Sequence, residues 1–175
     1  MNYNTKRAEM KILVTSGSGH GYTKKDAFDS ALIAARIADY NLIHLSSVIP
    51  LGSKIVLEEP KIIADHQGYK LYLVCSVAYA LKKGQEAWAG IGWVQELEGK
   101  GGLFVEQEGL SERVVKEDIE RSLQHMMDSR AIFGKKYGFI DHVMKGVQCE
   151  GNGIACALVA ALYKVESWDG KDFFF

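Results

Sequence analysis

The longest apolar run of the chain, IACALVAALY at residues 154–163, most constrains how the chain can fold. It is too short to span the hydrocarbon core of a bilayer, which takes about 20 residues of helix. We therefore expect these residues to form a strand or a helix buried inside a folded protein. The composition agrees, because 47% of the residues are apolar and 25% are charged, which is typical of a soluble globular protein.

The length and the charge of the chain limit its organisation and its partners. A chain of 175 residues predicts one domain, residues 1–175, with a core of ordinary size. The net charge is −1, from 21 basic and 22 acidic residues, so no overall field favours a nucleic acid or an anionic membrane as partner. The opening MNYNTKRAEMKILVT lacks the apolar core and cleavage site of a signal peptide, and we expect a cytoplasmic protein.

The cysteines and histidines give no sign of a metal centre or of disulfides. Cys75, Cys149 and Cys156 cannot all pair, and none belongs to a C-x-x-C sequence. The five histidines form no pair with the ligand spacing of a zinc finger. We expect reduced cysteines in apolar strands and no bound metal.

Helix and strand patterns both occur along the chain. KKDAFDSALIAARIADY at 24–40 predicts a helix that begins with a capping box of Thr23 and Asp26, and Asn41 lies just past its end. SERVVKEDIERSLQHMMDSR at 111–130 predicts a second helix. About seven strand-like segments accompany them, and the last two are joined around 151–153. This mixture predicts an α+β fold with a large content of sheet.

A glycine-rich segment, SGSGHGY at 16–22, follows the strand-like MKILVTSG and invites a nucleotide-binding interpretation. The details do not fit. A P-loop requires G-x-x-x-x-G-K-[ST], which does not occur here, and a dinucleotide fingerprint requires glycine where Tyr22 stands. We therefore predict a tight glycine-rich turn before the first helix.

The segment NLIHLSSVIP at 41–50 places Ser46 and Ser47 where a strand would favour Val, Ile or Thr. One interpretation is that both hydroxyls bond to local backbone at a strand end, before the turn at Pro50. The residues around the pair favour a second interpretation, which depends on a resemblance to a known family.

The segment DAFDSALIAARIADYNLIHLSSVIP at 26–50 resembles the pyruvoyl-dependent arginine decarboxylases. Those proteins share a Gly-rich loop, a helix carrying FD-x-AL, an asparagine soon after it, and a Ser-Ser or Thr-Ser pair followed by an apolar residue and a proline. GGLFVE at 101–106 is similar to the family segment that carries a catalytic glutamate, and GIACALVAALY is similar to the family's closing strand. The resemblance covers nearly the whole chain.

The resemblance implies that the chain cleaves itself between Ser46 and Ser47. Ser47 Oγ would attack the Ser46 carbonyl, and the resulting ester would eliminate and lose ammonia to leave a pyruvoyl group. The products would be residues 1–46, the β chain, and residues 47–175, the α chain. Asn41 matches the residue that stabilises the oxyanion of this step; the alternative is that Asn41 merely ends the preceding helix.

The resemblance further implies decarboxylation of L-arginine to agmatine and CO₂, through a Schiff base between the substrate and the pyruvoyl group. Neither pyridoxal phosphate nor a metal takes part. Glu106 would donate the proton that replaces CO₂, and its alternative is a solvated carboxylate on a strand. Asp29 would hold the substrate guanidinium through paired hydrogen bonds, and its alternative is a surface ion pair with Lys25.

The family fold is a four-layer α/β/β/α sandwich with two central, largely antiparallel sheets. The resemblance implies a homo-oligomer, a trimer or a dimer of trimers, with sites at subunit boundaries. Such an enzyme could serve polyamine synthesis or acid tolerance. Two alternatives stay open: a pyruvoyl-dependent decarboxylase of another amino acid, and a binding or scaffold homologue that does not cleave.

Overall fold

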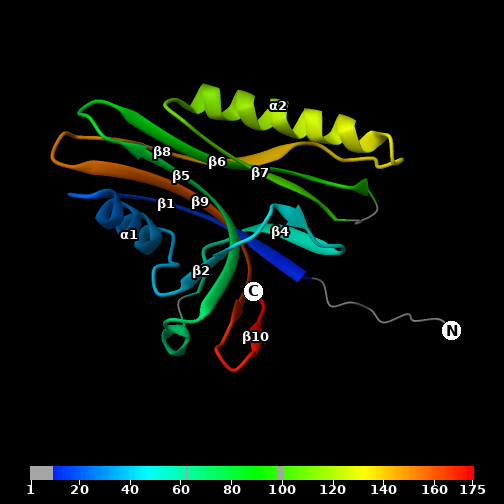
Figure 1. The fold of residues 1–175 in the computed structure, drawn as a ribbon, viewed down its shortest axis with the longest axis horizontal. Coiled ribbons are helices and arrows are strands. Elements are labelled where there is room, and N and C mark those ends of the chain that lie inside the picture. Colours follow the sequence, from blue (N-terminus) through cyan, green and yellow to red (C-terminus); the bar gives the residue numbers. More distant parts are fainter. Residues whose placement is uncertain (1–9, 62, 98–100) are drawn as a thin grey trace.

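The computed structural model describes residues 10–61, 63–97 and 101–175, and it arranges them in four layers (Figure 1). Two β-sheets face each other in the centre. Helix α1 (Lys24–Ala34) packs on the outer face of the first sheet, and helix α2 (Glu112–Ala131) packs on the outer face of the second. The predicted α+β class and the α/β/β/α sandwich are therefore confirmed.

Each sheet combines strands that are distant in the sequence. The first sheet has the order β2-β5-β9-β1-β4, with β10 attached to β9, and the second has the order β3-β7-β6-β8. Only β1–β4 and β2–β5 are parallel among the strand pairs of the described residues. The strands of the first sheet are β1 (Met10–Gly21), β2 (Asn41–His44), β4 (Ser53–Leu57), β5 (Lys70–Ala80), β9 (Ile154–Glu166) and β10 (Asp172–Phe173). Those of the second are β3 (Val48–Ile49), β6 (Glu86–Gln95), β7 (Gly102–Gly109) and β8 (Asp141–Gln148).

The long apolar run forms most of β9, in the middle of the first sheet between β5 and β1. Successive side chains of a strand point to opposite faces. Ala157, Val159 and Tyr163 belong to the core between the two sheets, whereas Leu158 and Leu162 belong to the core under α1. Because both faces are covered, the run contains almost no polar residue.

The predicted glycine-rich turn is wrong, because β1 continues as a strand through Gly21. Gly17, Gly19 and Gly21 all lie where α1 crosses the strand. A Cβ at Gly17 would lie 2.2 Å from the carbonyl oxygen of Ala31, and one at Gly19 would lie 2.4 Å from the Cβ of Ser30. The alternating glycines therefore remove side chains from the face of β1 that α1 contacts.

Helix α1 begins as predicted and ends earlier than predicted. Its capping box of Thr23 and Asp26 is confirmed. The helix stops at Ala34, because Arg36 adopts a left-handed backbone with φ of 63°. The amides of Arg36 and Ile37 then bond to carbonyl oxygens of the last turn, each at 3.0 Å, which is a Schellman ending.

The second half of the chain follows the predicted elements with one difference in topology. Helix α2 begins after the N-cap residue Ser111, as its pattern predicts. Strands β8 and β9 are joined through residues 151–153, but β8 pairs with β6 in the second sheet. The connection therefore crosses from one sheet to the other and forms no hairpin. The short strands β2, β3 and β10 raise the count of described strands above the seven expected.

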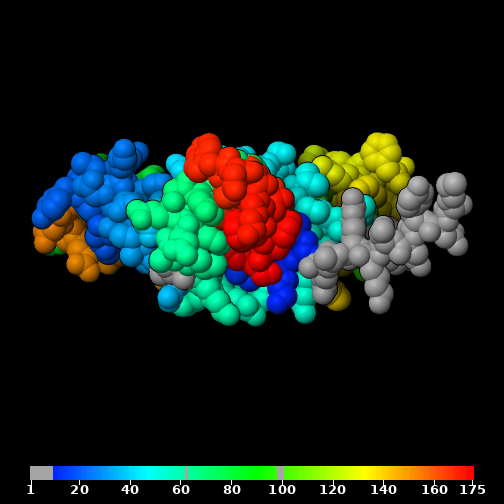
Figure 2. All heavy atoms as spheres, turned by 90° about the horizontal axis from the view of Figure 1, so that it is seen from below, coloured from blue at the N-terminus to red at the C-terminus, as the bar shows by residue number. Residues whose placement is uncertain are grey.

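The C-terminal strand β10 packs against the turn that contains a 3-10 helix (Ala64–His66). The ring centroids of His66 and Phe173 lie 4.4 Å apart, and Tyr69 stacks on the same pair. Figure 2 shows this red segment lying against the green residues of the turn. No helix in the described part of the chain combines the length and the apolar character that a membrane span requires.

Candidate active site

The Ser46–Ser47 segment links the two sheets, because β2 belongs to the first sheet and β3 to the second. Ser47 lies directly before β3, in the left-handed region with φ of 61°. This conformation is uncommon for a residue with a side chain and costs on the order of 1–3 kcal/mol. It persists only where the surrounding contacts hold it.

Three hydrogen bonds hold Ser47 and its neighbour. The amide of Phe104 donates to the Ser47 carbonyl at 2.8 Å. The hydroxyl of Ser47 donates to Glu106 Oε1 at 2.5 Å. The hydroxyl of Tyr163 donates to the Val48 carbonyl at 3.0 Å. The first two partners come from β7 in the second sheet, and Tyr163 comes from β9 in the first, so both sheets fix this point of the backbone.

Glu106 lies on β7 two residues after Phe104, on the strand face that points between the sheets. Phe104 is fully buried in the core between them, whereas the intervening Val105 packs toward α2. Alternation along the strand therefore puts Glu106 on the same face as Phe104. Burial, and then the charge of Glu106, raises the pKa of Tyr163, so its phenol stays protonated and can only donate to the Val48 carbonyl.

Asn41 and the serine pair stand at opposite ends of β2. Asn41 is the first residue of the strand, and its side-chain amide donates to the Gly68 carbonyl at 2.6 Å. The structure therefore does not bring this amide to the Ser46 carbonyl. The alternative that Asn41 ends α1 is wrong, since α1 stops at Ala34.

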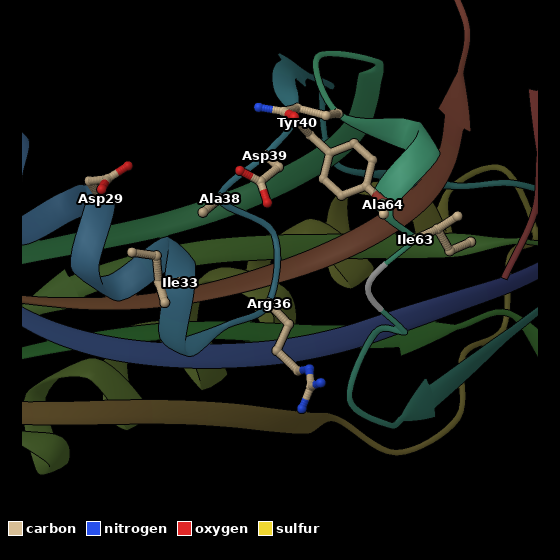
Figure 3. A pocket seen from close by; sticks show the side chains of 9 residues that line it. Asp29, Ile33, Arg36, Ala38, Asp39, Tyr40, Ile63 and Ala64 are labelled. Atoms are coloured by element: carbon tan, nitrogen blue, oxygen red, sulfur yellow. The ribbon is translucent and has the colours of Figure 1, made fainter.

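Asp29 lies exposed on α1 and lines a cavity of about 490 Å³ together with Asp39 and Tyr40. Figure 3 shows Asp29 on the helix, Asp39 on the following connection, and Arg36 directed away from both. Arg36 instead pairs with Glu59 at 3.2 Å. The described residues contain no ion pair between Asp29 and a lysine of its own helix.

The site residues predicted from the sequence thus fall in separate places within one chain. Ser46, Ser47 and Glu106 come together at the joint between the sheets. The cavity of Asp29 is lined by neither Ser47 nor Glu106. A smaller cavity of about 370 Å³ is lined by Val48 and by Arg130, which lies in the last turn of α2.

Two contacts, one at Ser47 and one at Val48, could not be predicted from the sequence. Phe104 acts through its backbone amide, which leaves no signal in the sequence. Tyr163 had a weak signal, because it ends the apolar run with a ring that carries a hydroxyl, and a buried hydroxyl usually requires a partner. The three cysteines are free, as expected. Within the described ranges, no group of three or more His, Cys, Asp or Glu side chains could hold a metal ion.

The fold and this site define an α/β/β/α protein with a serine–carboxylate pair at the joint of its two sheets. The family model of pyruvoyl-dependent arginine decarboxylase matches residues 11–168. The chain therefore belongs to the pyruvoyl-dependent arginine decarboxylase family, whose members are carboxy-lyases.

Several curated relatives carry the name pyruvoyl-dependent arginine decarboxylase. The protein of Methanothermobacter thermautotrophicus is 51% identical over 47 residues, which are 27% of this chain and 31% of that protein. Those of Thermococcus sibiricus and Pyrococcus horikoshii are 32% and 33% identical, over 67% and 65% of this chain and 72% and 70% of their own lengths. The chain thus matches under a third of the first relative and about 70% of the other two.

A solved structure of pyruvoyl-dependent histidine decarboxylase at pH 8 gives a TM-score of 0.40 with 17% identity, over 53% of this chain and 49% of that chain. A likeness of this size adds nothing to the assignment.

Proposed function

We propose that this chain decarboxylates L-arginine to agmatine and CO₂, with a pyruvoyl group that it makes by cleaving itself between Ser46 and Ser47. The observation that carries the proposal is the 2.5 Å hydrogen bond from Ser47 Oγ to Glu106, at a serine with φ of 61°. A hydroxyl bound to a carboxylate can lose its proton as it attacks a carbonyl.

The cleavage uses the chain's own atoms and one water molecule. Ser47 Oγ bonds to the Ser46 carbonyl carbon, the peptide bond to the Ser47 nitrogen breaks, and that nitrogen takes the proton. The ester then loses the Ser47 α-proton and releases Ser46 as a carboxylate, which leaves dehydroalanine. Its imine form takes up water and releases ammonia. Ser47 fits this role because only a residue with an oxygen on Cβ can eliminate in this way.

The attack of Ser47 Oγ builds negative charge on the Ser46 carbonyl oxygen. A hydrogen-bond donor near that oxygen lowers the barrier. We assign this role to Asn41 by its match to the family. Its amide would have to leave the Gly68 carbonyl, which accepts it at 2.6 Å.

The pyruvoyl group supplies an electron sink for the electron pair that departing CO₂ leaves on the substrate. Glu106 then donates a proton to the substrate carbon. Its position supports this assignment, because its carboxylate contacts the side chain of the residue from which the group forms. A donor within hydrogen-bond reach of the reacting group is the geometric requirement of general acid catalysis.

We assign recognition of the substrate guanidinium to Asp29. One chain alone does not unite Asp29 with Ser47, since the Asp29 cavity is lined by neither Ser47 nor Glu106. A homo-oligomer, a trimer or a dimer of trimers, would unite them if Asp29 of one copy faced Ser47 of another. The exposed apolar side chains Ile43, Leu45 and Val48 flank the serine pair and fit such a boundary between subunits.

The mass of the denatured protein tests the proposal. We expect two species, residues 1–46 and residues 47–175, the larger with a ketone-bearing N-terminus that has no free amine. Ser47→Ala should remain one chain, because alanine has no leaving group on Cβ, while Ser46→Ala should still cleave. The cleaved protein should release CO₂ from arginine. An intact wild-type chain after long incubation would contradict the proposal.

A further inference from the structure

Tyr163 makes a contact that crosses between the two sheets. It lies on β9 in the first sheet, and its hydroxyl donates at 3.0 Å to the carbonyl of Val48 on β3 in the second. Val48 is the residue that directly follows Ser47. Its carbonyl therefore lies two peptide units from the bond proposed to break.

The tyrosine itself is held firmly. Its side chain is 3% exposed, in the core between the sheets. Its ring packs edge-to-face on Phe104, with centroids 6.2 Å apart. The backbone amide of that same Phe104 donates to the Ser47 carbonyl at 2.8 Å. Tyr163 and Phe104 thus pack against each other and donate hydrogen bonds to two consecutive carbonyls, those of Val48 and Ser47.

These two hydrogen bonds matter because Ser47 has an unfavourable backbone conformation. A serine with φ of 61° relaxes to negative φ unless its neighbours are fixed. Strand β3 contains only Val48 and Ile49, so its ladder with β7 supplies few bonds. The Tyr163 hydroxyl adds a hydrogen bond to Val48 from the opposite sheet.

We propose that Tyr163 is a positioning residue for Ser47: its hydroxyl fixes the Val48 carbonyl, and through it the backbone angle at which Ser47 Oγ meets the Ser46 carbonyl. This inference rests on the proposed function and adds a residue to it. Tyr163 touches neither the serine hydroxyl nor Glu106 by a hydrogen bond of the described residues.

The same contact gains importance after cleavage. Breaking the bond between Ser46 and Ser47 turns residue 47 into a chain end, and chain ends fray unless they are tied down. The Phe104 amide at the carbonyl of residue 47, the pairing of β3 with β7 and the Tyr163 hydroxyl then hold the new terminus. Tyr163 thereby sets where the pyruvoyl group stands relative to the carboxylate of Glu106.

Tyr163→Phe tests the inference, because phenylalanine keeps the ring and its packing on Phe104 and removes only the hydroxyl. We expect cleavage to slow about tenfold, the effect of one ordinary hydrogen bond. In the cleaved protein, kcat for arginine should fall several-fold while KM stays within about twofold, since the guanidinium site is elsewhere. 4-Aminophenylalanine at position 163 restores a donor and should recover most of the cleavage rate.

Tyr72→Phe is the matched control. Tyr72 also lies in the first sheet and packs against the core between the sheets, but its hydroxyl donates to Glu166 at 3.0 Å. This variant should cleave at the wild-type rate. If the space left by the Tyr163 hydroxyl unfolds the Phe variant, 4-methylphenylalanine fills that space without a donor and replaces it in the comparison.

The outcomes separate the inference from the proposed function. A wild-type chain that never cleaves would overturn both. A wild-type chain that cleaves, with Tyr163→Phe equally fast and equal in kcat, would overturn the positioning role alone. Loss of cleavage in Tyr163→Phe that 4-aminophenylalanine does not recover would assign Tyr163 to core packing and would also overturn the inference.

Discussion

Residues 154–163 and residues 41–50 are both rich in apolar residues, yet the first segment is buried and the second is mostly exposed. In the first segment nearly every side chain is buried, on one face between the sheets and on the other under α1. In the second, Ile49 alone is buried, and Ile43, Leu45 and Val48 are exposed. The first segment is an uninterrupted strand, while the second is two short strands in different sheets with Ser46 and Ser47 between them.

The difference teaches where stability and chemistry reside in this molecule. A central strand covered on both faces contributes burial, about 25 cal/mol for each Å² of apolar surface removed from water. The segment that joins two sheets contributes little burial. Hydrogen bonds from both sheets can, however, hold its backbone in an unfavourable conformation, as at Ser47. We therefore expect changes near residue 47 to alter the reaction, and changes around β9 to alter stability.

Glu106→Gln should give the largest effect on the reaction side of this comparison. Glutamine keeps the size of the side chain but has no acid proton to donate, so turnover of arginine per cleaved chain should fall by roughly 10²–10⁴. Glu108→Gln is the control, because Glu108 lies two residues further along the same strand and is exposed. Steady-state CO₂ release measures both. Equal turnover in wild type and Glu106→Gln would leave this carboxylate without a catalytic role.

Asn41→Ala should come next. If the amide stabilises the oxyanion of cleavage, fragments 1–46 and 47–175 should appear about 10²–10³ times more slowly. If the amide only anchors the turn through the Gly68 carbonyl, cleavage should be normal and the free energy of unfolding should drop by about 1 kcal/mol. A time course by gel and a thermal melt distinguish the two. Asn152→Ala, in an exposed turn, should change neither quantity.

Gly19→Ala tests the stability side of the comparison, on β1, the strand that pairs with β9. The new Cβ would lie 2.5 Å from the backbone nitrogen of Ala31, so α1 must move outward. We expect a loss of about 1–3 kcal/mol in the free energy of unfolding, measured by urea denaturation. Gly138→Ala is the control, since its Cβ would meet only the Gln95 carbonyl oxygen at 3.6 Å. The surviving folded fraction should cleave at the normal rate.

Glu166, the last residue of β9, should give the smallest effect, a change in stability that appears only at acidic pH. Hydrogen bonds from Lys70, then Lys164 and Tyr72, lower the pKa of Glu166 from 4.5 to about 2. A carboxyl with a lower pKa in the folded state stabilises the fold above its unfolded pKa, and this contribution is lost as the pH falls from about 4.5 toward 2. Melting temperatures across this range should fall more steeply for wild type than for Glu166→Gln. Parallel curves would contradict the assignment.

The sequence determined much of the architecture because its regular patterns reflect burial. Spacing along α2 and the apolar run of β9 predicted elements that the structure contains, and the capping box of Thr23 and Asp26 marked the start of α1. The serine pair and Glu106 were named as candidates because the segments around them resemble segments of a known family, and the alternation of β7 agrees with the face on which Glu106 lies. Local patterns of this kind need no knowledge of distant partners.

Only the tertiary structure decided the features that depend on segments far apart in the chain. The glycines of β1 resembled a turn until α1 was found to cross them at a distance that excludes any side chain. The helix ended at Arg36 and left Asn41 to begin a strand. Ser47, Glu106 and Tyr163 are separated by more than fifty residues from one to the next. They meet because two sheets stack face to face, and such contacts follow from packing rather than from local sequence.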